Sequence, residues 1–157
     1  MTVVEDLHRA RDAYARREWV AAYEGLASAT DDALAADDFA RLATAAYLLG
    51  HRNDCIQALQ RAFQSSLADH DVAAAVRCAF WLAKVLFGGG EMAVGGGWVA
   101  RAERLLDEHP SDLVERGYVL LLMTFQRISA GDLAVARELA TQVEDYGRRY
   151  ADADLVS

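Results

Sequence analysis

The stretch Gly50-His51-Arg52-Asn53-Asp54-Cys55 begins a pattern that recurs along the chain and decides the fold. In each copy a three-residue frame is followed by a small residue five positions after the frame starts. The frame starts are 33, 40 and 41 residues apart, a spacing typical of helix-turn-helix repeats that stack into a solenoid. Such an architecture favours a binding surface over an enclosed active site. The frames are Arg17-Glu18-Trp19, Gly50-His51-Arg52, Gly90-Glu91-Met92 and Gly131-Asp132-Leu133, and the small residues are Ala22, Cys55, Gly95 and Ala136.

The composition indicates a single helical domain over residues 1-157. The chain is 54% hydrophobic, rich in Ala and Leu, and has one proline, so helix formers are almost uninterrupted. No stretch has the roughly 20 uncharged apolar residues of a membrane span, and residues 1-6 lack the basic and apolar regions of a signal peptide. We therefore expect a cytoplasmic protein without a membrane partner.

The net charge of -8 argues against direct nucleic-acid binding, because phosphate contacts depend on clustered Lys and Arg. Lys84 is the only lysine, and the arginines are dispersed among acids. These residues are typical of solvated helix faces.

The apolar residues recur with a period near 3.6, which predicts helices rather than strands. Short turn sequences separate the helical blocks, so neighbouring helices should be antiparallel. Ser111 and Asp132 are expected N-caps. The predicted fold is all-α, a right-handed solenoid of about four helix hairpins. The predicted helices are 3-16, 19-30, 37-49, 53-67, 71-87, 91-107, 112-129 and 133-149.

With these helices in place, the chain resembles the tetratricopeptide repeat family. In that family small residues lie where the two helices of a repeat, and adjacent repeats, approach closely. The first repeat departs from the pattern at Asp6 and Arg9, which indicates a slipped helix or a polar cap.

A narrower resemblance covers most of the chain. Four strings resemble the repeat region of actinobacterial LuxR-type transcription regulators, in which the repeats precede a DNA-binding helix-turn-helix. No such DNA-binding module occurs in these 157 residues. The resemblance therefore implies a regulatory or sensor region that does not itself contact DNA. The strings are Ala45-Ala46-Tyr47-Leu48-Leu49-Gly50, Cys78-Ala79-Phe80-Trp81-Leu82-Ala83, Gly96-Gly97-Trp98-Val99-Ala100-Arg101-Ala102 and Val114-Glu115-Arg116-Gly117-Tyr118.

Catalytic, metal and cofactor sites have little support in the sequence. Cys55 and Cys78 are 22 residues apart with neither in a C-x-x-C pair, and His51 beside Cys55 supplies only two ligands. Asp54, next to His51 and Cys55, completes the only local group of potentially reactive side chains. Close helix packing at the second frame already explains the small residue Cys55. The glycines at 95-97 lack the lysine and preceding strand of a phosphate loop, so close helix packing is the favoured interpretation. We expect no catalysis, no metal and no cofactor.

The first helices of the repeats should line a concave groove. An aromatic groove with a few cations suits a peptide or amphipathic helix that carries an acidic side chain. A small-molecule effector bound in the same groove is the alternative, and an aromatic row at helical spacing is also typical of a packed core. The predicted groove residues are Tyr14, Tyr47, Arg77, Phe80, Lys84, Phe87, Tyr118, Leu121 and Phe125.

The end of the chain carries a partial repeat. Residues 153-157 echo residues 111-115 at a spacing of 42, as if a fifth repeat began and stopped, which indicates a truncated chain. The apolar side of the last helix would then lack a neighbour and could be buried against a second copy. We therefore expect homodimerisation through Leu133, Leu139 and Val143.

Overall fold

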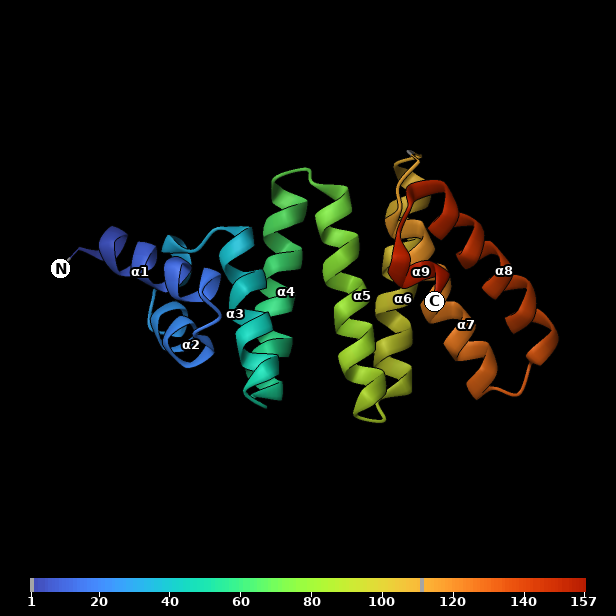
Figure 1. Cartoon of the computed structure of the whole chain (residues 1–157), viewed down its shortest axis with the longest axis horizontal. Helices are drawn as coiled ribbons and strands as arrows, with labels where there is room; N and C mark the ends of the chain where they lie inside the picture. Colours follow the sequence, from blue (N-terminus) through green and yellow to red (C-terminus); the bar gives the residue numbers. More distant parts are fainter. Residues whose placement is uncertain (1, 111) are drawn as a thin grey trace. The chain divides into compact units, whose positions relative to one another are not determined.

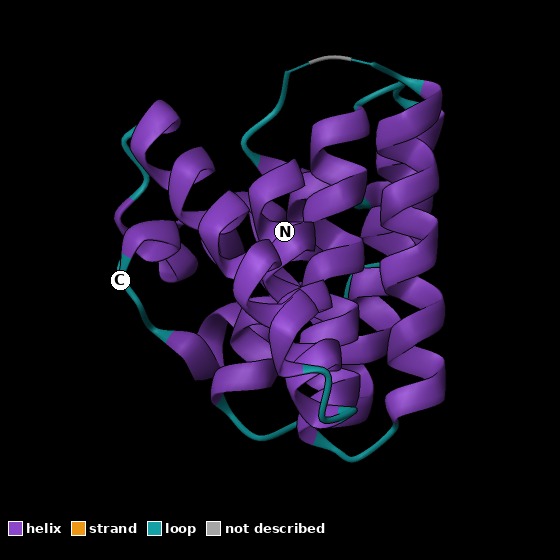
Figure 2. Cartoon of the chain, turned by 90° about the vertical axis from the view of Figure 1, so that its right-hand side faces the viewer, coloured by secondary structure: helices purple, strands orange, loops and turns teal. Residues whose placement is uncertain are grey.

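The computed structural model describes residues 2–110 and 112–157, and the described residues form helices joined by turns and loops (Figures 1 and 2). A short 3-10 helix, η1, covers Asp31–Ala33. The α-helices are α1 (Val3–Ala15), α2 (Trp19–Ala27), α3 (Ala36–Leu48), α4 (Arg52–Ala68), α5 (Val72–Gly88), α6 (Met92–Glu108), α7 (Glu115–Ser129), α8 (Leu133–Tyr150) and α9 (Ala153–Val156).

The helices fall into two compact units, Met1–Asp71 and Val72–Ser157. In the first, α1 packs on α2 and α3 on α4, and α2 and α3 connect the two pairs. In the second, α5 packs on α6 and α7 on α8, while α7 also contacts both α5 and α6. The short α9 packs on α8 and α7. One continuous repeat domain and a right-handed superhelix stay predictions.

The recurring frame forms the turn inside each helix hairpin. The first frame residue has a positive φ in all four copies, and the next residue donates its backbone N–H to the carbonyl five positions earlier, as in His51 to Ala46 at 2.8 Å. This is a left-handed helix end of the Schellman type, which favours glycine. Gly50, Gly90 and Gly131 satisfy that preference, whereas Arg17 adopts the same conformation at φ 61°.

The small residues of the frame are packed between helices. Ala22, Cys55 and Ala136 are almost fully buried. At Gly95 a Cβ atom would lie 2.6 Å from the Phe87 ring, so only glycine leaves room for that ring. The frame therefore brings the two helices of each hairpin together, as its spacing predicts.

A buried carboxylate joins successive pairs in the first unit. Asp38, at the start of α3, is fully buried and accepts hydrogen bonds from the Arg11 guanidinium of α1 at 2.8 and 2.6 Å. Arg41 and the backbone N–H of Ala35 donate to it as well. Asp6 and Arg9, by contrast, are exposed on α1.

Three features near helix ends differ from the predicted boundaries or test them. The second helix ends at Ala27, not residue 30, and η1 follows it. The seventh begins at Glu115, not residue 112; the predicted cap Ser111 lies outside the described residues. Asp132 does cap α8, because its side chain accepts from the Val135 N–H at 3.3 Å. Across the described ranges, no helix is both long enough and apolar enough to cross a bilayer.

Candidate partner-binding site

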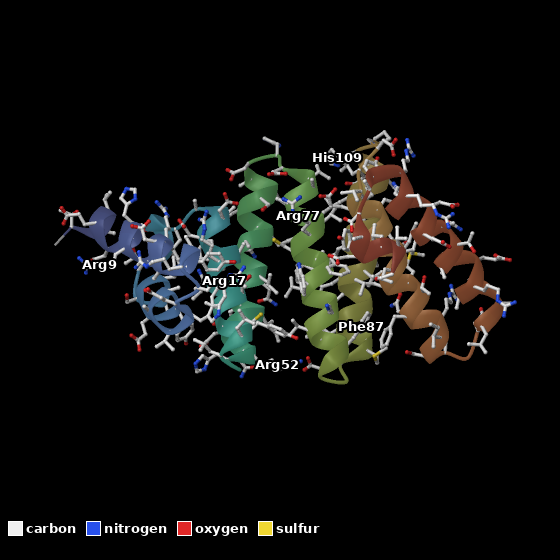
Figure 3. All side chains as sticks on the ribbon, viewed as in Figure 1. Arg9, Arg17, Arg52, Arg77, Phe87 and His109 are labelled. Carbon is white, nitrogen blue, oxygen red and sulfur yellow. The ribbon has the colours of Figure 1, made fainter. Side chains whose placement is uncertain are left out.

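Helices α5 and α7 lie beside each other in the second unit and run in the same direction. Residues in contact across the two helices are 38 positions apart at three successive levels, which requires parallel helices in a fixed register. These contacts join Arg77 to Glu115, Phe80 to Tyr118, and Phe87 to Phe125. Figure 3 labels Arg77 and Phe87 at separate turns of α5.

The aromatic contact between Phe87 and Phe125 depends on the frame glycine, Gly95. Phe87 is 8% exposed because its ring occupies the space that a side chain at Gly95 would need. Its ring centroid lies 5.7 Å from that of Phe125, which remains 47% exposed. Phe87 is therefore a buried support for the Phe125 ring, whereas the Phe125 ring itself is exposed to solvent.

The other aromatic contact joins three rings. Phe80 is buried and packs edge-on against Tyr118 at 5.3 Å and against Trp81 at 5.4 Å. The Tyr118 hydroxyl donates to the Asp152 carboxylate, at the start of α9, at 2.7 Å. Burial, together with this hydrogen bond, raises the pKa of Tyr118 to about 12. Tyr118 is thus held as a neutral donor at neutral pH.

Large apolar side chains remain exposed above these buried rings. Leu121, Phe125 and Ile128 follow one stripe of α7 at 38%, 47% and 53% exposure, and Trp81 on α5 is 44% exposed. The Lys84 ammonium nitrogen lies 4.6 Å from the centroid of a Trp81 ring. We call the surface formed by Trp81, Lys84, Leu121, Phe125 and Ile128 the α5–α7 face.

An ion pair closes the end of this arrangement. An Arg77 Nη1 atom donates to Glu115 Oε1 at 2.7 Å, and the Glu115 side chain is only 9% exposed. Because the Glu115 carboxylate is largely removed from water, it depends on a cation for stabilisation, and Arg77 provides that cation.

Two predicted groove residues, Tyr14 and Tyr47, belong to the first unit. Tyr14 is half-buried and packs edge-on against Trp19 at 5.4 Å. Tyr47 is 54% exposed near the end of α3. The structure brings the other seven predicted residues together on α5 and α7, so the candidate site is confined to the second unit.

The groove prediction needs one correction, since Phe80 and Phe87 are buried supports and not contact residues. Sequence reasoning missed Trp81. A usable signal was its i, i+3 spacing from Lys84, which places an aromatic ring and a cation on one side of α5.

The predicted self-association residues also lie differently from the expectation. Leu139 and Val143 are 9% and 5% exposed because they belong to the side of α8 that packs inside its own unit. Leu133 alone of the three is exposed, at 65%. The expectation that this whole apolar side lacks a neighbour is therefore wrong.

The terminal α9 occupies a notch that two glycines leave between α7 and α8. A Cβ atom at Gly117 would lie 2.7 Å from Leu155, and one at Gly147 would lie 2.6 Å from Val156. Leu155 is consequently 4% exposed. The preceding turn has a positive φ at Ala151, as the turn before α5 has at His70.

The reactive residue types near the second frame are held by ordinary contacts. Cys55 is buried, and burial raises the pKa of its thiol to about 11, so it is a thiol at neutral pH. The His51 ring stacks on Tyr23 at 4.7 Å, and the Tyr23 hydroxyl donates to Asp54 at 2.5 Å. Over residues 2–110 and 112–157, no three His, Cys, Asp or Glu side chains are grouped to hold a metal ion.

No model of a known protein family matches the chain, and no curated protein matches it. The chain is similar to the crystal structure of aspartyl phosphate phosphatase F from Bacillus subtilis, with a TM-score of 0.72 and 15% identity. The similarity covers 98% of this chain and 42% of the phosphatase chain, so the chain spans less than half of that protein's length. It confirms an all-α, tetratricopeptide-like fold of about eight helices in consecutive antiparallel pairs.

Proposed function

We propose that the chain is a non-catalytic interaction module that binds a peptide or protein segment on the α5–α7 face. The observation that carries the proposal is the exposure of four large apolar side chains, Trp81, Leu121, Phe125 and Ile128, on two neighbouring helices. Apolar side chains gathered on one exposed face are typical of interaction sites.

The support beneath this face favours binding with little rearrangement. Phe80, Phe87 and Tyr118 are fixed by ring contacts across α5 and α7 and by the hydrogen bond to Asp152. A partner therefore meets side chains whose helices are already in register, which reduces the entropy lost on binding. Helix faces of this kind receive extended or helical segments whose apolar side chains lie in the groove.

The structure favours a peptide over a small-molecule effector. An enclosed pocket between α5 and α7 would have to be lined by the rings that point between these helices. Phe80 and Phe87 are instead 7% and 8% exposed, so they fill that space with their own side chains. The apolar surface that is left lies on the outside, where a segment of a partner can cover it.

A regulatory role is the finer part of the proposal. It is supported by the resemblance of four strings in this chain to the repeat region of LuxR-type transcription regulators. In that role the bound segment would change the state of a protein to which the repeats are attached.

The test is a selection of random peptides displayed on phage, followed by affinity measurements with the selected peptides. Phe125→Ala should weaken their binding by about tenfold or more, as expected when a central aromatic contact is removed. The matched control is Leu133→Ala, which truncates an exposed apolar residue on α8. Unchanged helical circular dichroism in both variants shows that the fold is kept. Peptides that bind Phe125→Ala as well as the wild-type protein would show that the face is wrongly assigned.

A further inference from the structure

We infer that the segment bound on the α5–α7 face is acidic as well as apolar, and that one of its carboxylates pairs with Lys84. This inference rests on the proposed function and specifies the chemistry of the partner. It follows from how charge is distributed over the helices and from which cations are already paired.

Charge is divided unevenly between these two helices and the rest of the chain. The net charge is -8, with 24 acidic residues and 16 Lys and Arg. Helix α5 has no acidic residue, and the only one in α7 is Glu115. The same two helices carry four cations, Arg77, Lys84, Arg116 and Arg127. The α5–α7 pair is thus positive within a negative protein.

Three of these four cations already have carboxylate partners. Arg77 pairs with Glu115 at 2.7 Å, Arg116 lies 3.5 Å from Asp107, and Arg127 lies 3.8 Å from Asp132. Lys84 has no carboxylate partner within the described ranges, and its ammonium group lies over the Trp81 ring. Lys84 is therefore the cation that a partner can neutralise.

The position of Lys84 fits an acidic residue set among apolar ones. Helical spacing places it between the two aromatic contacts of α5, four residues after Phe80 and three before Phe87. Leu121 has the corresponding place on α7, between Tyr118 and Phe125. Phe80 and Phe87 themselves are buried, so a segment lying along this face would meet the exposed Trp81 of α5 and the exposed Leu121 and Phe125 of α7 around the ammonium group.

The cation–π contact prepares Lys84 for this pairing. A lysine that lies over an indole ring is partly ordered before the partner arrives, and the ring contact can persist beside a carboxylate. Charge complementarity also guides encounter and selects among partners more than it adds affinity. Basic segments should be disfavoured, since the face itself has no free carboxylate to receive them.

The experiment uses the full chain and the same phage-displayed random peptides, selected without regard to charge. The sequences that bind should contain more Asp and Glu than the starting library. Lys84→Glu should weaken the binding of the selected acidic peptides by about tenfold, because it replaces the attraction between Lys84 and a peptide carboxylate by a repulsion between two carboxylates. The matched control is Arg137→Glu, the same charge reversal at an exposed site on α8, which should leave binding unchanged.

The outcomes separate this inference from the proposed function. Suppose that Phe125→Ala weakens binding, but the selected peptides have no excess of Asp and Glu or bind Lys84→Glu as well as the wild-type protein. The inference of an acidic partner is then wrong, whereas the proposed function of the α5–α7 face is retained. If Phe125→Ala has no effect on binding, or no peptide is selected above background, both the proposed function and the inference of an acidic partner are overturned. Weaker binding at higher salt, lost in Lys84→Glu, would support the ion pair.

Discussion

Replacing Asp38 by alanine should destabilise the first unit more than any change on its surface. The side chain is fully buried and receives four hydrogen bonds, from Arg11 Nε at 2.8 Å and Nη2 at 2.6 Å, Arg41 Nη1 at 3.0 Å and the Ala35 backbone N–H at 3.1 Å. It therefore joins α1 to α3 and also caps the start of α3.

The size of the effect follows from these contacts. Loss of the bond to Ala35 costs about 1 kcal/mol, as for other helix caps. Removing one partner of a buried ion pair costs about 3–5 kcal/mol when the other charge stays buried. The side chains of Arg11 and Arg41 are 35% and 34% exposed, so water can solvate them again and reduce that cost. We expect a total loss of about 3 kcal/mol.

Urea unfolding followed by helical circular dichroism measures this loss. Asp37→Ala is the control, because Asp37 is the exposed neighbour in the same first turn of α3 and should change stability by less than about 0.5 kcal/mol. Asp38→Asn should lie between the two, since an amide oxygen can still accept from Ala35. A loss below about 1 kcal/mol for Asp38→Ala would refute the view that this carboxylate joins the two pairs.

The same residue predicts how stability depends on pH. The hydrogen bond from Arg11 lowers the pKa of Asp38 below its ordinary value, with further contributions from Ala35 and Arg41. A lowered folded-state pKa stabilises the protein at pH values above the unfolded pKa of about 3.9. This contribution is lost as pH falls from there through the folded pKa. The difference in stability between wild type and Asp38→Ala should therefore be constant near neutral pH and shrink in acid, whereas a difference independent of pH would contradict the ion pair.

The remaining predictions concern packing and turns, and urea unfolding tests each of them. Gly95→Ala should destabilise the protein by about 1–3 kcal/mol because its methyl group would overlap the Phe87 ring. The control Gly97→Ala, with open space around it, should be neutral or stabilising by up to about 1 kcal/mol, and equal effects at the two sites would argue against the close approach. Arg17→Gly should stabilise by about 0.5–1 kcal/mol because glycine adopts the φ of 61° without strain, and a loss of stability would show that the arginine side chain matters more than its backbone. Leu155→Ala should cost about 2–3 kcal/mol by emptying the notch between α7 and α8, whereas no loss would mean that α9 is not docked there.

The recurring frame allowed the fold to be predicted because it acts locally. A positive φ at Gly50, Gly90 and Gly131 ends one helix, and the small residue five positions later sets the distance between that helix and the next. Both effects depend on residues close in sequence, so their spacing is visible without the structure. The seventh helix, which begins at Glu115 and not at the predicted residue 112, is not preceded by such a frame.

The exposure of individual groove residues could not be predicted in the same way. Helical periodicity gives the direction in which a side chain points, but not how deep it lies. Phe87 and Phe125 were both predicted to line the groove and their rings are in contact, yet one is 8% and the other 47% exposed. The difference depends on Gly95, which makes room for the first ring and belongs to another helix. Leu139 and Val143 were misassigned for the same reason, because the neighbour that buries them is not evident from their own stripe.

The division between small and large residues explains why the candidate site lies on α5 and α7. Helix α6 has glycine at 95 and 96, where added Cβ atoms would lie 2.6 Å from Phe87 of α5 and 3.2 Å from Gln126 of α7. Both first helices can therefore approach α6 closely, which brings them into contact with each other. The large side chains of α5 and α7 can then lie either between the two helices or on the outer surface. Phe80 and Phe87 fill the space between the helices, so Trp81, Leu121 and Phe125 are left on the outer surface. The glycines that determine the packing of the fold thus also determine which side chains a partner can reach.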